Sequence, residues 1–420
     1  MCLNWIMIEG LGTMKPLSIY IHIPFCKSKC HYCDFLSAPA PETKMADYVA
    51  ALLSEMEAEA LSYQGYEVRT VFLGGGTPSV LAPGQIEAIL CKLKDRFCFG
   101  GPTEPEITIE VNPGTITSVT LKKYQAAGIN RISFGLQSAD ENELKLLGRI
   151  HTYEEFLSAY HWARNLGFEN INIDLMSALP GQSFSSFKAT LEKVAALEPE
   201  HISVYSLMLE PGTPFYEKYV SRTEKAHEIA DEEEVRKIDS FTKSYLEAKN
   251  IKRYEISNYA KPGFFCRHNL TYWRRGDYVG FGLGAASMVD NKRWSNTSDL
   301  KSYIMIYRHF ESANADRKKT ASASGSSAAG KNISLSPKEK LQVLSIKEQM
   351  EEFMFLGLRL TQGVDINHFK NTFRCDIQEC YGPVLRRLEA QNLIRTGENI
   401  RLTAYGTDIS NYVLAQFLLD

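Results

Sequence analysis

The sequence has neither a long hydrophobic run nor an excess of charge of one sign. Its apolar stretches fall short of the ~20 residues that span a bilayer. The 47 Lys and Arg residues nearly balance the 50 Asp and Glu residues, so no overall field attracts nucleic acid or an anionic membrane. We therefore expect no membrane-spanning helix and no nucleic-acid partner, and membrane contact only through a partner protein.

A secretory signal is also missing. Residues 1–16 carry an apolar patch, but neither a basic segment nor a small-residue cleavage site accompanies it. We expect these residues to form an N-terminal tail of a cytoplasmic protein, with Met14 as a second candidate for the natural start.

Cysteine is too sparse and too uneven for a disulfide framework. The chain has nine cysteines in 420 residues, and six of them are scattered (Cys2, Cys91, Cys98, Cys266, Cys375 and Cys380). The other three, Cys26, Cys30 and Cys33, fall within eight residues of the stretch HIPFCKSKCHYCDF. The sequence therefore indicates one cysteine site.

The first half of the chain alternates short β-rich runs with one-sided helical patterns. In the helical runs, apolar residues recur at intervals of three and four. The expected strands are residues 17–23, 68–74, 106–111, 129–135, 170–176 and 201–207, and the expected helices are 47–61, 84–97, 117–128, 153–167 and 186–198. Six βα units in series require right-handed crossovers and a parallel sheet, either open or curled into a barrel.

The last quarter has a different organisation. Residues 312–337 are rich in Ser, Ala, Gly and Lys, which predicts a solvated linker. Residues 338–420 predict helices followed by a Gly-centred hairpin, an arrangement typical of a small winged-helix-like α+β domain. With 10 Lys and Arg against 11 Asp and Glu, this domain lacks the basic surface that DNA binding requires. A packing or partner-docking role is favoured.

Three chemistries fit the cysteine cluster. Cys30 and Cys33 have the spacing of a thioredoxin-type redox pair, but that leaves Cys26 unexplained. A zinc site needs four closed ligands, and no second pair follows. Three thiolates on an iron–sulfur cluster leave one iron with an open position, which the amino and carboxylate groups of S-adenosylmethionine can fill.

With this spacing directly after a first strand, the chain resembles the radical S-adenosylmethionine superfamily. Within it, the motifs resemble the branch of oxygen-independent coproporphyrinogen III oxidase and the HemW-type haem chaperones. The resemblance implies a partial (βα)6 TIM-like barrel over residues 17–311 and a [4Fe–4S] cluster on Cys26, Cys30 and Cys33.

Polar residues at the ends of the predicted strands indicate a ligand site. Parallel βα folds build their sites at the carboxyl ends of the strands, and a polar residue inside a buried strand is costly without a partner. The resemblance assigns to S-adenosylmethionine the turn residues Gly75, Gly76 and Thr77, the strand-end residues Glu110, Gln137 and Asp174, and Arg149, Tyr20 and Tyr32.

Two features favour the haem chaperones over the oxidase. The oxidase pattern continues with another cysteine two residues after the third and has a longer N-terminal extension, whereas here Cys33 is followed by Asp34 and Phe35. The run CRHNLTYW resembles a motif of the chaperone branch. It suggests His268 as a haem ligand, with Cys266 as a second candidate and the aromatic rings of Tyr272 and Trp273 over the porphyrin.

We therefore expect a haem chaperone that holds a [4Fe–4S] cluster and S-adenosylmethionine and delivers haem to an acceptor protein. An electron donor such as a flavodoxin or ferredoxin would serve the cluster. The alternatives are oxygen-independent coproporphyrinogen III oxidase activity and, from another class, a zinc-stabilised binding module.

Overall fold

Six parallel strands linked by helices form the first half of the chain. The computed structural model describes residues 14–101, 103–221, 223–321 and 338–419. The strands are β1 (Lys15–Ile23), β2 (Tyr66–Gly75), β3 (Glu106–Val111), β4 (Arg131–Gln137), β5 (Ile171–Ser177) and β6 (His201–Ser206). They pair in this order, each parallel to the next.

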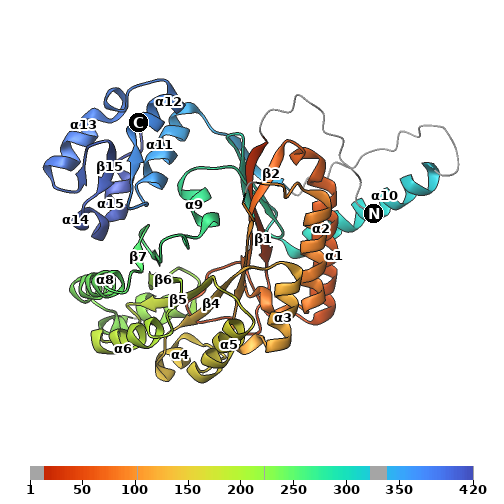
Figure 1. The fold of residues 1–420 in the computed structure, drawn as a ribbon, viewed down its shortest axis with the longest axis horizontal. Helices are drawn as coiled ribbons and strands as arrows, with labels where there is room; N and C mark the ends of the chain where they lie inside the picture. The colour runs from red at the N-terminus through yellow and green to blue at the C-terminus, as the bar shows by residue number, and fades with distance from the viewer. Residues whose placement is uncertain (1–13, 102, 222, 322–337, 420) are drawn as a thin grey trace.

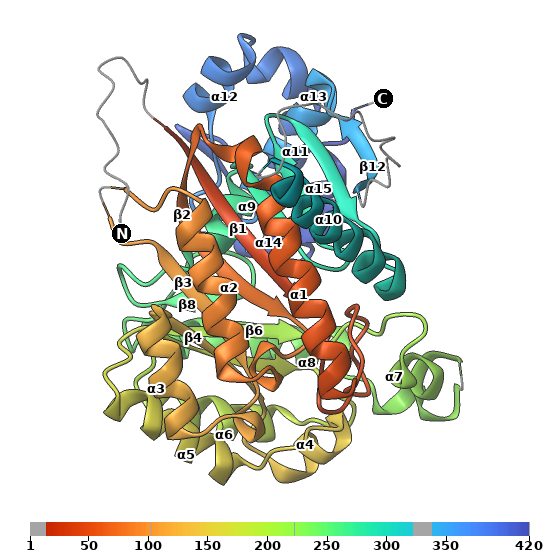
Figure 2. The same ribbon diagram turned by 90° about the vertical axis from the view of Figure 1, so that its right-hand side faces the viewer.

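The connecting helices lie on the convex side of this sheet (Figures 1 and 2). They are α1 (Glu42–Glu59), α2 (Pro83–Arg96), α3 (Ser118–Ala127), α4 (Glu141–Leu147), α5 (Tyr153–Asn165) and α6 (Phe184–Ala195). Single turns accompany them at η1 (Ala60–Tyr63), η2 (Pro78–Val80) and η3 (Pro113–Thr115). The sequence analysis missed α4, whose seven residues are too few to show a helical period.

Apolar and polar residues alternate along the parallel strands, as in KPLSIYIHI of β1, EITIEV of β3 and INIDLMS of β5, so the apolar side chains form one buried face. The side chains of Ile19, Ile21, Val71, Ile109 and Ile173 are fully buried. Strong local signals set the helix ends. Thr152 and Glu155 form a capping box at the start of α5.

The sheet extends beyond the six strands on both sides. Its full order is β12-β11-β10-β9-β1-β2-β3-β4-β5-β6-β8-β7. The added strands are β7 (Lys252–Arg253), β8 (Asn258–Ala260), β9 (Tyr278–Phe281), β10 (Ala286–Val289), β11 (Lys292–Asn296) and β12 (Lys338–Val343). Because β1 and β6 do not pair with each other, the curved sheet is a barrel that stays open, and the predicted partial (βα)6 barrel is confirmed.

The segment after β6 supplies further helices and turns. It contains α7 (Pro214–Tyr216), η4 (Glu217–Ser221), η5 (Thr223–Glu228), α8 (Glu232–Glu247), α9 (Arg267–Trp273) and α10 (Leu300–Ala321). Helix α9 lies on the concave side of the sheet, between it and the C-terminal domain (Figure 1). In the part of the chain that the structure describes, no helix is both long and apolar enough to cross a membrane.

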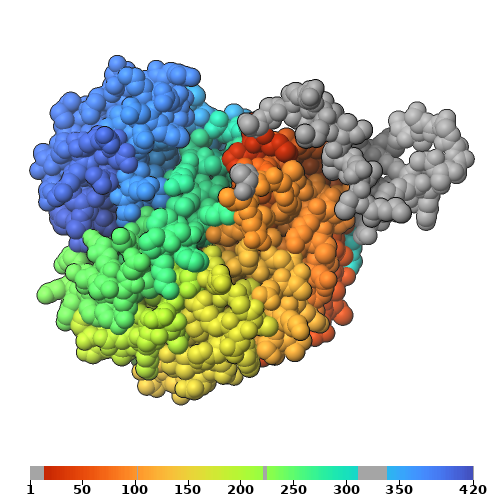
Figure 3. Space-filling view, viewed as in Figure 1, coloured from red at the N-terminus to blue at the C-terminus, as the bar shows by residue number. Residues whose placement is uncertain are grey.

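The C-terminal domain has its own small core. It contains α11 (Ile346–Gly357), β13 (Val364–Asp365), α12 (Ile366–Phe373), α13 (Ile377–Ala390), β14 (Ile394–Arg395), β15 (Asn399–Leu402), α14 (Ala404–Asp408) and α15 (Ser410–Ala415). Met354, Phe369, Tyr381 and Leu388 are fully buried in this core. The expected two-stranded wing has β13 as a third strand. Figure 3 shows this domain against the green and teal segments of the barrel.

The structure corrects two boundaries expected from the sequence. Residues 312–321, expected in the linker, continue α10, because an existing helix gains one hydrogen bond for each residue added. The rest of the expected linker, 322–337, lies outside the described residues, as does most of the expected tail. Residues 338–343, expected in the C-terminal domain, form β12 and pair with β11 in the large sheet.

Candidate functional site

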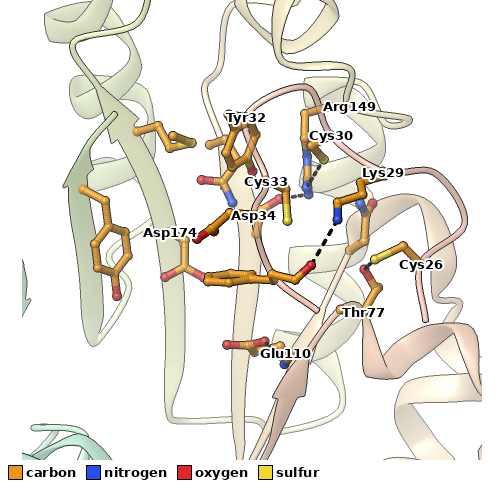
Figure 4. A pocket seen from close by; sticks show the side chains of 18 of the residues that line it. Cys26, Lys29, Cys30, Tyr32, Cys33, Asp34, Thr77, Glu110, Arg149 and Asp174 are labelled. Carbon is orange, nitrogen blue, oxygen red and sulfur yellow. Dashed lines mark hydrogen bonds between the residues drawn. The ribbon is translucent and has the colours of Figure 1, made fainter. Parts of the chain in front are cut away.

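The three clustered cysteines line a cavity of about 500 Å³ at the carboxyl ends of the parallel strands (Figure 4). Most of the residues expected at the S-adenosylmethionine site line the same cavity. These are Tyr32, Gly75, Gly76, Thr77, Glu110, Gln137, Arg149 and Asp174. The strand order brings them together, because the carboxyl ends of neighbouring parallel strands share one edge of the sheet.

Backbone hydrogen bonds tie the cysteine loop to the glycine turn after β2. The Gly76 amide donates to the Ile23 carbonyl (2.8 Å), and the Thr77 amide donates to the Phe25 carbonyl (2.7 Å). A Cβ atom at Gly76 would lie 2.5 Å from the Phe25 oxygen. Glycine therefore permits this close approach of two backbones.

Two of the thiols have polar partners. The Thr77 hydroxyl donates to Cys26 Sγ (3.7 Å), and a guanidinium nitrogen of Arg149 donates to Cys30 Sγ (3.5 Å). Burial raises the pKa of the third thiol, that of Cys33.

Two carboxyl groups face each other across the cavity floor. Glu110 accepts a hydrogen bond from the Gly75 amide (3.2 Å). Asp174 accepts bonds from the Ser133 hydroxyl (3.0 Å) and the Asn172 amide (2.8 Å). Burial, followed by the charge of Asp174, raises the pKa of Glu110 to about 8, and burial also raises the pKa of Asp174. A cationic ligand group at this floor would lower the raised pKa values of both carboxyl groups.

Two expected site residues do not line the cavity. Tyr20 points to the barrel interior, where its hydroxyl lies 3.1 Å from His22 Nδ1 and its ring stacks on Phe72. His268 is 1% exposed, with Nδ1 2.8 Å from the Thr70 hydroxyl and Nε2 2.9 Å from the Tyr272 hydroxyl.

Haem iron could bind the His268 imidazole only if one of these hydrogen bonds broke. Both ring nitrogens of His268 already have partners, and burial lowers its pKa to about 3. Trp273 is half-buried and lies under the Arg359 guanidinium (4.3 Å), and Cys266 is fully buried. The motif builds a polar contact between α9 and β2.

The sequence analysis missed several residues at the cavity mouth. Lys29, Asp34 and Phe35 come from the cysteine loop, Tyr205 lies at the end of β6, and Met208 follows that strand. The rule that identified residues at the ends of β3, β4 and β5 applies equally to the end of β6. Phe35 is 62% exposed, Met208 65% and Tyr205 41%, so the mouth has an apolar rim.

Among the described residues, no three His, Cys, Asp or Glu side chains converge on one point as ligands of a single metal ion. Structural zinc requires four such ligands around one ion. A cluster with several irons instead places its thiolates around a larger body. The cysteines surround part of a cavity, which suits the cluster.

Comparison with known proteins places the chain in a family. Residues 20–194 match the Radical SAM superfamily, and residues 344–408 match the HemN C-terminal domain. "Heme chaperone HemW" of Lactococcus lactis subsp. lactis (strain IL1403) is 32% identical, with 97% of this chain and 98% of the relative covered. The protein of the same name from Bacillus subtilis (strain 168) is 34% identical, over 96% and 99%. The chain belongs to the HemW family of the radical SAM superfamily.

The fold comparison agrees with this membership. The solved structure described as "Coproporphyrinogen III oxidase (HemN) from Escherichia coli is a Radical SAM enzyme" superimposes with a TM-score of 0.79, covering 97% of this chain and 91% of that one. At 24% identity, this likeness shows a shared fold.

Radical SAM membership implies a [4Fe–4S] cluster and S-adenosylmethionine, and the cavity fits both. Three thiols, two of them with donors, face one space, and buried Arg149 has an Nε without a hydrogen-bond partner. The glycine turn gives a ligand access to the backbone. A Cβ at Gly75 would lie 2.5 Å from the His22 ring, and φ is +109° there, so this turn requires glycine.

Proposed function

We propose that the chain is a haem chaperone that binds haem and delivers it to an acceptor protein. Its close relatives carry that name over nearly the full length of this chain. The observation that carries the proposal is the single cavity shared by three thiols and the strand-end polar groups. In this proposal Cys26, Cys30 and Cys33 hold a [4Fe–4S] cluster.

The remaining cavity residues take S-adenosylmethionine. When bound, the cluster supplies an iron with one open position, suited to the amino and carboxylate groups of this ligand. Gly75 and Gly76 offer backbone, while Glu110 and Asp174 offer carboxyl groups to its cationic parts. An electron donor such as a flavodoxin or ferredoxin would approach the cysteine loop.

We place haem at the apolar rim of the cavity. Haem needs an accessible apolar surface, and Phe35, Tyr205 and Met208 provide one. The Met208 thioether is a type of axial ligand that haem iron accepts. The ammonium group of Lys29, which donates to the Phe35 carbonyl (3.1 Å), is placed to meet a haem propionate.

The haem site can be tested by titrating haem into the cluster-loaded protein under anaerobic conditions. We expect Met208→Ala to lower haem affinity at least tenfold and Met305→Ala, an exposed methionine on α10, to leave it unchanged. Unchanged haem affinity in Met208→Ala, together with a lower haem affinity in His268→Ala, would show that haem binds at the motif on α9 instead of at the cavity rim. The cluster absorption and EPR signals should persist in all three variants.

The oxidase alternative makes a different prediction from the same preparation. Coproporphyrinogen III, S-adenosylmethionine and a reductant are added, and protoporphyrinogen is measured over time. We expect no steady production. Continued turnover would refute the chaperone assignment while leaving the cluster assignment intact.

A further inference from the structure

Two cysteines outside the cavity lie side by side in the C-terminal domain. The Sγ atoms of Cys375 and Cys380 are 3.1 Å apart, and both thiols are free and partly exposed. The sequence analysis counted both among scattered cysteines, because five residues separate them and only the fold brings their side chains together.

The pair occupies two defined positions at the start of α13. Asp376 is the N-cap residue, and its carboxylate accepts a hydrogen bond from the Gln378 amide (2.9 Å). Cys375 therefore precedes the cap and Cys380 is the fourth residue of the helix. Side chains at these positions commonly pack against each other as a hydrophobic staple.

An apolar pair would fill this staple equally well, but two thiols add a chemical property that leucine or valine lacks. Their sulfurs, 3.1 Å apart, need to approach by only about 1 Å more to reach the ~2.05 Å of a disulfide bond. Both pack against the small core of the domain beside Ile377 and Tyr381, and the left-handed backbone at Arg374 (φ +58°) directs the chain into the turn. The approach of the sulfurs is thus set by the surrounding fold.

We propose that Cys375 and Cys380 form a thiol–disulfide exchange site whose substrate is a small disulfide. One cysteine thiolate attacks the small disulfide, forms a mixed disulfide and releases one thiolate. The second cysteine then attacks the mixed disulfide, closes the Cys375–Cys380 bond and releases the second thiolate. In total, two protein thiols are oxidised and one small disulfide is reduced to two thiols.

The surroundings assign an order to the two cysteines. Burial, together with the neighbouring Cys375, raises the pKa of the Cys380 thiol to about 11, which keeps it protonated at neutral pH. Cys375 lies before the N-cap of this 14-residue helix and is the other thiol of the pair. Cys375 attacks first, and Cys380 resolves the mixed disulfide.

The test uses the full-length, cluster-loaded protein incubated anaerobically with glutathione disulfide. After alkylation of the remaining thiols, trypsin releases CDIQECYGPVLR (residues 375–386), which contains both cysteines. We expect this peptide to lose two hydrogens and both alkylation sites, while exposed Cys91 and Cys98 carry at most single glutathione adducts. A peptide that remains fully alkylated, or carries only glutathione, would overturn the proposal.

A variant identifies the attacking cysteine. Cys380→Ser removes the resolving thiol, so we expect a stable glutathione adduct on Cys375. The reciprocal Cys375→Ser variant should leave Cys380 at least tenfold less modified. Equal modification of the two variants would contradict the order. The alkylation state of the wild-type peptide tests the disulfide exchange without any variant. A variant that folds poorly therefore does not affect this result.

Discussion

Glu110 should make the ligand-free protein less stable as the pH rises. Its pKa is about 8 in the folded chain against 4.5 for an ordinary glutamate, because it is buried beside Asp174. The folded chain therefore binds more protons than the unfolded chain between these values, so stability is lost as pH rises from ~4.5 to ~8.

Replacing Glu110 with Gln should remove this loss. We expect wild type to lose roughly 1–4 kcal/mol more than Glu110→Gln between pH 5 and pH 8, at about 1.4 kcal/mol for each unit of pKa. Urea unfolding of cluster-free protein at both pH values measures the difference. Glu42→Gln, at an exposed position on α1, should follow wild type. Equal pH dependence in wild type and Glu110→Gln would contradict the assignment.

Gly76 should tolerate no side chain, because the cysteine loop passes directly over it. An alanine Cβ would press on the carbonyl oxygens of Phe25 (2.5 Å) and Ile23 (3.0 Å). We expect Gly76→Ala to cost about 1–3 kcal/mol and to displace the loop. Reconstituted protein should then contain less iron per chain. Gly84→Ala on α2, where no atom lies within 4 Å, is the matched control and should keep the full iron content.

For single residues, the sequence predicts well which strand-end side chains reach the cavity, and it predicts poorly which loop side chains do. Glu110 and Asp174 reach the cavity because parallel strands end at one edge, which follows from chain order alone. Met208 lies in a loop, where no repeating sequence pattern indicates which way a side chain points. The sequence could not show the partners of His268, because its contacts with Thr70 and Tyr272 are fixed by how α9 packs on β2.

Helix α11 is fixed to the barrel by one buried carboxylate. Glu352, 5% exposed, accepts a hydrogen bond from Arg275 (3.0 Å) and forms an ion pair with Arg293 of β11 (2.7 Å). Removing it leaves the buried Arg275 without its carboxylate partner, whereas the Arg293 side chain is 39% exposed, and breaking a buried pair costs about 3–5 kcal/mol. We expect Glu352→Ala to lose stability of this order in urea unfolding.

The control for this prediction is Lys347→Ala, an exposed position earlier on α11. Hydrogen exchange should locate the effect. In Glu352→Ala, protection should fall across residues 346–419 and stay unchanged in β1–β6. A uniform loss over the whole chain would show that Glu352 does not act at this boundary.

Among the helices and strands, those with a regular hydrophobic period were predicted from the sequence. Those whose place depends on a pairing partner elsewhere in the chain were not. The six parallel strands and their longer helices were found because buried strands and one-sided helices leave clear patterns. Strand β12 was assigned to the wrong unit, since its partner β11 is more than 40 residues earlier in the sequence. No local pattern in KEKLQV identifies the strand with which it pairs.

The residues that the structure describes form two main hydrophobic cores of very different size. This difference should separate the unfolding of the C-terminal domain from that of the barrel. The core of the C-terminal domain contains 13 fully buried apolar residues, far fewer than the barrel core. We expect the domain to unfold first in urea and the barrel at higher concentration, because the smaller core buries less apolar area.

The tryptophans allow the two steps to be separated. The domain from 346 onward contains none, and Trp273 lies at its boundary beneath Arg359. With both Trp5 and Trp273 replaced by Phe, fluorescence reports the barrel through Trp162 and Trp294, while circular dichroism reports both parts. We expect the dichroism to change at lower urea than the fluorescence. Coincident curves would show that the two cores unfold as one unit.

After α10 the chain returns to the large sheet through β12, and this allows the protein to be made as two separate fragments. Helix α10 packs against α1 through Tyr303 and Tyr48, and β12 completes the sheet beside β11. A break placed between residues 321 and 338 would therefore leave each fragment holding part of one shared sheet. The C-terminal fragment would donate a strand to the other, as one protein does to another in strand addition. Two separately translated pieces would reassemble through an interface that the intact chain already contains.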